Sequence, residues 1–221
     1  LGPVSIQLGI QVTYRNGKGA QRPQKTYLRE VLQRFFPKGL NAIKEGGTPL
    51  DYINKINDST CPETPDPEIK RQFQEIFGCI LYACYNTRPD LAVCMTILGR
   101  YMANPGAAHL TAIKRVLRYI AGSLDRCIEY KNSNYKLLSG EVINPHQLIN
   151  FTDADWAGDA DRRLSTSGTI TMLAGGPVSW RSQTQKLQAL SSMESELIAS
   201  CEGAKDIMYF RNTFAQSHFC S

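Results

Sequence analysis

The sequence of 221 residues has no uncharged apolar run that approaches the roughly eighteen residues of a membrane-spanning helix. Its start, L-G-P-V-S-I-Q-L-G-I, lacks the basic residues and long apolar core of a signal peptide, and it lacks an initiating Met. Internal repeats and low-complexity tracts are absent as well. These absences argue against a membrane-spanning or secreted protein, and they predict an intracellular segment cut from a longer chain.

The seven cysteines include no C-x-x-C pair and no His at metal-ligand spacing. Their number is odd, and most lie in apolar runs such as F-G-C-I-L-Y-A-C-Y, where a free cysteine behaves as a small buried hydrophobe. The pattern favours reduced, structural thiols in an intracellular setting. Disulfides or a zinc site are the alternatives.

Hydrophobic residues make up 42% of the chain and charged residues 20%, which is typical of an ordinary globular protein. The length allows one large domain or two small ones. The net charge of +5 is unevenly distributed, because residues 1–146 are net basic and residues 147–221 are net acidic. This asymmetry fits a surface that grips a nucleic-acid backbone beside a cation-binding pocket, although moderately basic solvated faces are common.

Hydrophobic periodicity predicts a strand at 4–14 and an amphipathic helix at 24–36, followed by a Gly- and Pro-rich loop up to residue 67. Three more helices are expected over about 68–85, 89–102 and 107–121. In the last of these, Leu110, Ile113, Leu117 and Ile120 form the expected buried stripe. Lys114, Arg115 and Arg118 lie off this stripe, and we expect them to help hold a nucleic-acid duplex.

Residues 131–147 are polar and predict a linker between domains. The elements expected after it are a strand at 148–154, a loop at 155–166, hairpin strands at 167–173 and 177–182, and a helix at 192–214. Strands followed by a helix predict an α/β order, and the whole chain is α+β. The apolar stripe expected to pack the last helix is Leu190, Met193, Leu197, Cys201 and Ala204.

Carboxylates gather at the end of the strand and at the start of this helix. Asp153 and Asp155 share one face if the strand extends that far. Ser191 and Glu194 match the capping box S-x-x-E, which gives Glu194 a structural role. Glu196 has no such role and flanks the apolar stripe, where a partly buried carboxylate needs a partner.

A divalent cation between Glu196 and Asp153 would supply that partner, because Mg²⁺ prefers carboxylate and water oxygens. The alternative is an acidic, solvated loop beside a helix cap. Residue spacing does not distinguish these two interpretations.

Several motifs in order resemble the copia-type retrotransposon Pol polyproteins. F-T-D-A-D-W-A-G-D-x-D-x-R-x-S-T-S-G, L-A-G-G-P-V-S-W-R-S-Q-T-Q-K and A-L-S-S-M-E-S-E-L-I-A-S resemble their RNase H domain. Upstream, F-G-C-I-L-Y-A-C-Y-N-T-R-P-D-L-A-V and A-A-H-L-T-A-I-K-R-V-L-R-Y-I-A-G-S resemble the segment that joins polymerase and RNase H. L-G-I-Q-V, the helix from Tyr27 to Phe35 and G-T-P-L-D resemble the end of the reverse transcriptase region.

The resemblance divides the chain into a thumb-like end of the reverse transcriptase with a loop, a helical connection, a linker and a partial RNase H-like fold made of strand, hairpin and helix. The corresponding ranges are 1–67, 68–130, 131–147 and 148–221. Such a domain hydrolyses the RNA strand of an RNA–DNA hybrid with two metal ions, Mg²⁺ or Mn²⁺.

The resemblance places catalytic, metal-binding carboxylates at Asp153 (in F-T-D) and Glu196 (in S-E-L-I-A), with Asp155 as a further metal candidate. Arg181 and Lys186, after the strand V-S-W, become candidates for phosphate contact. The implied partners are the hybrid or another nucleic acid and the remainder of the polyprotein, located in the cytoplasm, a virus-like particle or the nucleus.

Two departures from the family pattern limit what is expected of this chain. It has no Y-x-D-D-type polymerase motif, and it ends before the family's next aspartate, which lies in a D-N motif. The parent is therefore expected to be an RNA-directed DNA polymerase with ribonuclease H, and this segment alone is expected to be inactive or strongly impaired. The alternative function is a non-catalytic nucleic-acid-binding or structural relic of such an element.

Overall fold

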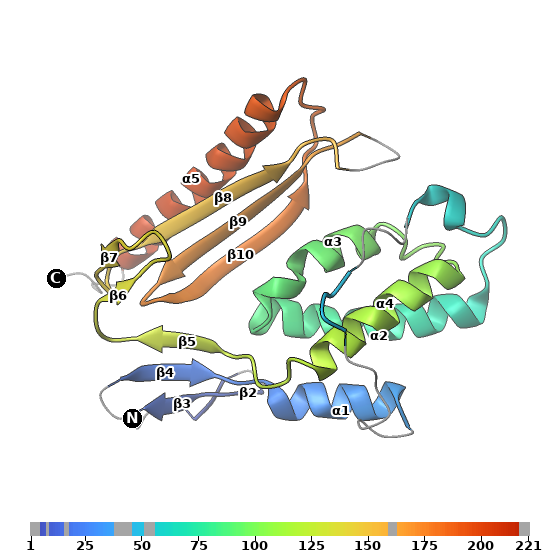
Figure 1. The fold of residues 1–221 in the computed structure, drawn as a ribbon, viewed down its shortest axis with the longest axis horizontal. Coiled ribbons are helices and arrows are strands. Elements are labelled where there is room, and N and C mark those ends of the chain that lie inside the picture. Colours follow the sequence, from blue (N-terminus) through green and yellow to red (C-terminus); the bar gives the residue numbers. More distant parts are fainter. Residues whose placement is uncertain are drawn as a thin grey trace. The chain divides into compact units, whose positions relative to one another are not determined.

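The computed structural model describes residues 5–7, 9–15, 18–37, 46–50, 56–158 and 163–216. These residues form helices and several small sheets, which confirms the predicted α+β class (Figure 1). The chain divides into two compact units, of which the first comprises residues 1–13 and 22–128 and the second comprises residues 14–21 and 129–221. Within the described ranges, no helix combines the length and apolar character needed to cross a membrane.

The first unit is mainly helical. Its elements are β1 (Ile6–Gln7), β2 (Ile10–Gln11), α1 (Lys25–Phe35), η2 (Asp58–Thr60), α2 (Pro67–Asn86), η3 (Pro89–Leu91), α3 (Ala92–Gly99) and α4 (Ala107–Ala121). The helices predicted over 24–36, 68–85 and 107–121 are confirmed. The helix predicted over 89–102 is shorter and is preceded by the 3₁₀ turn η3, while the strand predicted over 4–14 is broken into short pairs.

Local signals explain where α2 begins and ends. The Asp66 carboxylate accepts hydrogen bonds from the Glu68 and Ile69 amides at 2.9 and 3.2 Å, and Pro67 occupies the first helical position. The helix ends before Arg88-Pro89, because the residue that precedes a proline disfavours helical geometry. The helix boundaries are thus encoded within a few residues at each end.

The core of the first unit lies between the apolar faces of its helices. Phe73, Ile76 and Ile80 of α2 and Ile113 and Leu117 of α4 are completely or almost completely buried. Each such side chain contributes about 1.5–3 kcal/mol through removal of apolar surface from water. The predicted stripe of α4 is therefore confirmed at Ile113 and Leu117.

Two cysteine thiols belong to this core. Cys84 and Cys94 are buried, and burial raises the pKa of both thiols to about 12, with the negative charge of Asp90 adding to the shift. The two side chains are therefore neutral at physiological pH and act as small apolar groups. None of the described cysteines forms a disulfide.

A buried guanidinium joins the end of α2 to the end of α4. Arg88 is 1% exposed and donates to both carboxylate oxygens of Asp90, at 2.9 and 2.8 Å. It also donates to the carbonyl and the hydroxyl of Ser123, at 3.3 and 2.8 Å. The Tyr119 hydroxyl donates to Asp90 at 2.8 Å, so the carboxylate is held by several donors.

The charge state of Asp90 follows from these contacts. Burial by itself would raise the pKa of the carboxyl group, but hydrogen bonds and positive charge from Arg88 outweigh burial. Further donation from Tyr119 and the nearby charge of Arg126 act in the same direction, and the pKa of Asp90 lies below its ordinary value. The pair is ionised at neutral pH.

His109 caps α4 from inside the fold. Its Nδ1 accepts a hydrogen bond from the Gly106 amide at 2.9 Å, and its Nε2 lies 3.3 Å from the Thr60 hydroxyl. The centroid of its ring lies 4.1 Å from the centroid of the Tyr101 ring. The side chain is fully buried. Burial lowers the pKa of the imidazole, and the charge of Asp58 opposes this shift only in part.

The second unit contains two three-stranded sheets. Its elements are β3 (Thr13–Arg15), β4 (Gly19–Arg22), β5 (Ile128–Lys131), β6 (Tyr135–Lys136), β7 (Val142–Ile143), β8 (Ile149–Asp155), β9 (Thr166–Leu173), β10 (Gly176–Thr184) and α5 (Ser192–Gln216). The predicted order of strand, hairpin and helix is confirmed. Residues 131–147, predicted as a linker, include the small antiparallel hairpin β6–β7.

Helix α5 runs along one face of the sheet β10-β9-β8 (Figure 1). A Cβ atom on Gly203 would lie only 2.2 Å from Asn150 Oδ1 and 2.4 Å from Thr152 Cγ2, so the helix backbone packs directly on β8. On β9, Thr169 donates to Asp206 of the helix at 3.2 Å. Small residues therefore set a close distance between helix and sheet.

The prediction that an apolar stripe packs α5 against the rest of the fold is wrong. Leu190, Met193 and Leu197 are 87%, 80% and 64% exposed. The buried positions of the helix are Ser195, Ala199 and Gly203 instead. Large side chains would hold the helix away from the sheet, so the small residues face it and the large ones face solvent.

The predicted cap of α5 is confirmed, with one change. The Glu194 amide donates to the Ser191 hydroxyl at 3.2 Å. The Glu194 carboxylate accepts from the Leu190 amide at 2.7 Å, one residue before the amide that a capping box uses.

Replacing either of two helical glycines by alanine should change the free energy of unfolding, in opposite directions at the two positions. Gly203→Ala inserts a methyl group against Asn150 and Thr152 and should destabilise the second unit by about 1–3 kcal/mol. Gly78→Ala in α2 meets nothing within 4 Å and should stabilise its helix by about 0.5–1 kcal/mol. Urea unfolding of both variants measures the difference, and an equal effect of the two would contradict the close packing of α5.

Replacing Arg88 should be far more damaging than replacing an exposed arginine. Arg88→Met removes two of the hydrogen bonds to the Asp90 carboxylate and the guanidinium donor of the Ser123 carbonyl, and should cost about 3–5 kcal/mol. Arg71→Met in α2 removes only exposed pairs with Glu68 and Glu75 and should scarcely move the unfolding midpoint. Similar midpoints for the two variants would show that the buried pair is not needed for stability.

Stability of the first unit should decrease in mild acid. The folded state binds a proton at His109 less readily than the unfolded chain, whose imidazole has the ordinary pKa of 6.5. The free energy of unfolding is therefore highest above this pKa and falls as the pH drops below it. His109→Gln should flatten the pH dependence between pH 7.5 and 5, and His146→Gln, at an exposed position, should leave it unchanged.

Candidate active site

Asp153 and Asp155 lie on β8, the edge strand of the sheet β10-β9-β8. In the antiparallel register Asp153 is opposite Gly168 and Asp155 is opposite Thr166. Since side chains alternate along a strand and Thr152 faces α5, both aspartates are on the other face of β8. Both are exposed.

The Asp155 side chain lies against the turn that follows β8. A Cβ atom on Gly158 would lie 1.9 Å from Asp155 Oδ2, so this carboxylate folds back over the turn. The Trp156 indole donates to the Ala189 carbonyl at 3.2 Å, which ties the turn to the segment just before α5. Asp153 is therefore the more accessible of the two aspartates. Asp159 and Asp161 lie outside the described residues.

Glu196 lies on the side of α5 that faces β8. It is two helical turns before Gly203, which packs against Asn150 and Thr152. Those seven residues span about 10 Å along a helix, close to the length of three residues of a strand. Glu196 is therefore level with the end of β8 that carries Asp153.

The direction of α5 agrees with this position of Glu196 beside the end of β8. Gln185 donates from one amide nitrogen to both the Ser167 hydroxyl and the Ser195 carbonyl, at 2.8 and 2.9 Å. Ser167 is paired with Ala154 in the sheet. The start of α5 is thus at the end of β8.

The carboxylates of α5 differ in their hydrogen-bond and ion-pair partners. Glu194 caps the helix, Glu202 pairs with Lys205, and Asp206 pairs with Arg181. Glu196 is exposed and has no hydrogen bond or ion pair with any described residue, and the same is true of Asp153 on the strand. Two uncommitted carboxylates thus border the outer edge of β8 from its two sides.

The donor set suits a hard divalent cation, because exposed carboxylates with spare oxygens are the ligands that Mg²⁺ takes together with water. Within the described residues, no three His, Cys, Asp or Glu side chains cluster closely enough to form a complete metal cage. The predicted site at Asp153 and Glu196 therefore consists of two separate ligands, and their joint binding of a metal stays a prediction.

The predicted phosphate ligands of the second unit have different surroundings. Arg181 pairs with Asp206 at 3.2 Å and with Glu202 at 3.6 Å, so its guanidinium holds α5 to β10. Lys186 is exposed between β10 and α5. A phosphate contact at either residue stays a prediction.

The predicted basic face of α4 in the first unit is present. Lys114, Arg115 and Arg118 lie on the outer side of the helix. Arg115 also donates to the carbonyl and hydroxyl of Thr48, at 3.3 and 2.9 Å, and so holds a segment of chain from residues 46–50. Binding of nucleic acid by this face stays a prediction.

Sequence reasoning missed two polar positions of the first unit. Arg88 follows an apolar helix and precedes a proline, and only its sequence neighbour Asp90 could have suggested a buried pair. Gln24 precedes α1 and is 5% exposed, beside a cavity that no residue pattern indicates.

Two curated relatives of the chain carry a common name. A retrovirus-related Pol polyprotein from transposon TNT 1-94 of Nicotiana tabacum is 33% identical over 215 residues, which is 96% of this chain and 15% of the polyprotein. The corresponding polyprotein from transposon RE2 of Arabidopsis thaliana is 35% identical over 86% of this chain and 12% of its own length. This chain therefore spans a small part of each of these two relatives.

A relative of another kind is a secreted RxLR effector protein of Plasmopara viticola, which is 38% identical over 60% of this chain and 86% of its own length. No family model and no solved structure matches the sequence. The similarity to the tobacco protein covers 96% of the chain and therefore extends through both units. The chain belongs to the family of retrovirus-related Pol polyproteins from copia-type transposons.

Proposed function

We propose that the second unit carries two metal-binding carboxylates of a ribonuclease H, and that the parent polyprotein is a reverse transcriptase with ribonuclease H activity. The observation that carries this proposal is the state of Glu196. It is the α5 carboxylate without an internal partner, and it is level with Asp153 across the edge of β8.

The chemistry follows from the residues at this edge. Asp153 and Glu196 would hold Mg²⁺ or Mn²⁺, and the bound metal would activate water and stabilise the leaving oxygen during hydrolysis of the RNA strand of an RNA–DNA hybrid. Asp153 and Glu196 supply negatively charged oxygens. Asp155 is a further candidate ligand once its carboxylate leaves the turn at Gly158.

Basic residues support a nucleic-acid partner. Lys114 and Arg118 extend from the outer side of α4, and Lys186 is exposed before α5. Side chains of this kind bind phosphate groups independently of base sequence, with an affinity that falls as salt increases. Such contacts would hold a hybrid whose RNA strand is to be cut.

The metal site is tested with Mn²⁺, which broadens NMR signals of nearby residues. The amide signals of 153–155 and 195–197 should broaden first. Asp153→Asn and Glu196→Gln should each weaken Mn²⁺ binding at least about tenfold, because each removes one of two charged ligands. Glu194→Gln is the matched control, since it makes the same change two residues away at the helix cap and should leave binding unchanged.

Cleavage of an RNA–DNA hybrid is measured with the same variants, and any Mg²⁺-dependent cleavage should disappear in Asp153→Asn. Broadening centred elsewhere, or equal in Asp153→Asn, would refute the metal site. Hybrid binding that needs no metal and leads to no cleavage would support the alternative, a non-catalytic nucleic-acid-binding module.

A further inference from the structure

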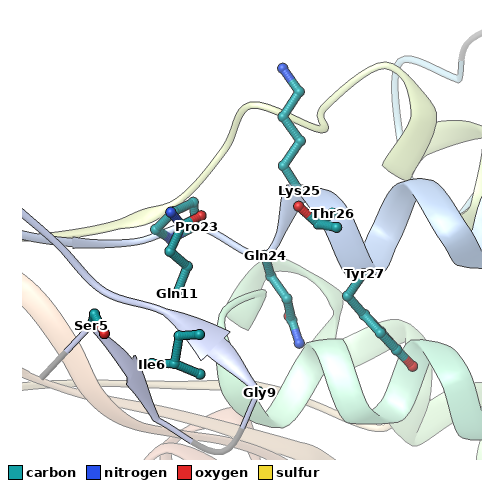
Figure 2. A pocket seen from close by; sticks show the side chains of 9 residues that line it. All are labelled: Ser5, Ile6, Gly9, Gln11, Pro23, Gln24, Lys25, Thr26 and Tyr27. Carbon is teal, nitrogen blue, oxygen red and sulfur yellow. The ribbon is translucent and has the colours of Figure 1, made fainter.

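The first unit contains a cavity of about 350 Å³ beside the start of α1 (Figure 2). Its lining comes from the short strands β1 and β2 and from the first turn of the helix. The nine lining residues are Ser5, Ile6, Gly9, Gln11, Pro23, Gln24, Lys25, Thr26 and Tyr27. None of them is acidic.

Gln24 gives this cavity a buried donor without a partner. Its side chain is 5% exposed, and its Oε1 accepts a hydrogen bond from the Thr87 hydroxyl. Its Nε2 is buried and makes no hydrogen bond. A buried donor left in this state destabilises the folded protein, and an acceptor in the cavity would remove that cost.

The start of α1 adds further donors. No side chain caps this eleven-residue helix, and its first turn contains no acidic residue. The Leu28 amide donates to the Gln24 carbonyl, so the amides of Lys25, Thr26 and Tyr27 come before the first intrahelical hydrogen bond. Uncapped amides at a helix start carry partial positive charge and favour an anion.

Two other polar groups of the lining are already engaged. The Lys25 ammonium group pairs with Asp125, and Figure 2 shows it extending away from the Gln24 amide. The Tyr27 hydroxyl donates to the Cys79 carbonyl at 3.0 Å. The amide nitrogen of Gln24 and the helix amides therefore remain as donors, beside the side chains of Ser5, Gln11 and Thr26.

We propose that this cavity binds a phosphate group, with one phosphate oxygen accepting from Gln24 Nε2 and others from the first amides of α1. A phosphate offers several negatively charged acceptors and no obligatory donor, which matches a lining that offers donors and no carboxylate. The phosphate could be inorganic phosphate, the terminal phosphate of a nucleotide chain, or a backbone phosphate of nucleic acid. The site is in the first unit and needs neither Asp153 nor Glu196.

The test follows amide signals by NMR while inorganic phosphate is added at constant ionic strength. The backbone signals of Lys25, Thr26 and Tyr27 and the side-chain signal of Gln24 should shift and saturate together. Gln24→Glu replaces the donor by a carboxylate and should weaken phosphate binding at least about tenfold. Gln33→Glu adds the same charge at an exposed position of α1 and should leave the affinity unchanged.

A second variant keeps the test decisive if Gln24→Glu does not fold. Gln24→Met with Thr87→Val replaces both hydrogen-bond partners by apolar groups of similar size, so the fold should persist while phosphate binding is lost. Asp153→Asn should bind phosphate normally, which separates this site from the carboxylates of the second unit.

Three ligands distinguish the source of the phosphate: inorganic phosphate, a 5′-phosphorylated oligonucleotide, and the same oligonucleotide without the terminal phosphate. Saturating shifts of the α1 signals with any of them support the site, and the ligand with the highest affinity identifies the source. The proposal is overturned if no ligand shifts these signals, or if Gln24→Glu responds as strongly as the unchanged protein.

Discussion

The burial of one guanidinium constrains how the ends of the helices in the first unit come together. Arg88 is 1% exposed, and a cation at such a depth is tolerated only where an anion and several acceptors meet it. Asp90 and Ser123 provide them, so the end of α2, the turn η3 and the segment after α4 have to come together around this side chain. Apolar packing between the helices is non-directional, whereas the hydrogen bonds of this pair have preferred directions.

Helices with local start and stop signals were predictable from the sequence. α4 lies between Gly106 and Gly122 and has the predicted boundaries, and α2 follows the cap at Asp66 and ends at a proline. Periodicity indicates that a helix has an apolar side, but not that this side is buried. In α5 the large apolar residues face solvent, because the sheet below it presents small polar residues that accept only a close backbone.

The face of the sheet that lies under α5 explains why the residue pattern predicted the wrong buried side of this helix. Ser167, Thr169 and Thr171 of β9 are buried under the helix, although their hydroxyl groups indicate an exposed face. Their polar atoms are satisfied by Gln185, Asp206 and Asn150, all distant in sequence. Hydrogen bonding of this kind depends on tertiary contacts, so no local pattern reveals it.

At the candidate site, too, local sequence signals were predictable and tertiary contacts were not. Capping rules assigned Glu194 to the helix start, which left Glu196 as the candidate ligand, and the structure shows Glu194 in that role. The pairing of Arg181 with Asp206 and the buried amide of Gln24 could not be predicted, because their partners and their burial come from segments brought together by folding.

The contact at Gly203 also has a consequence for how this sequence can change over time. An alanine there meets Asn150 and Thr152, so every larger residue at position 203 is disfavoured while those two side chains keep their size. Smaller residues at positions 150 and 152 of β8 remove this obstacle, although the change at 150 also removes the hydrogen bond to Thr171. Substitutions in these two segments therefore have a permitted order, with β8 first and α5 second, and lineages that differ at position 203 should also differ on the strand.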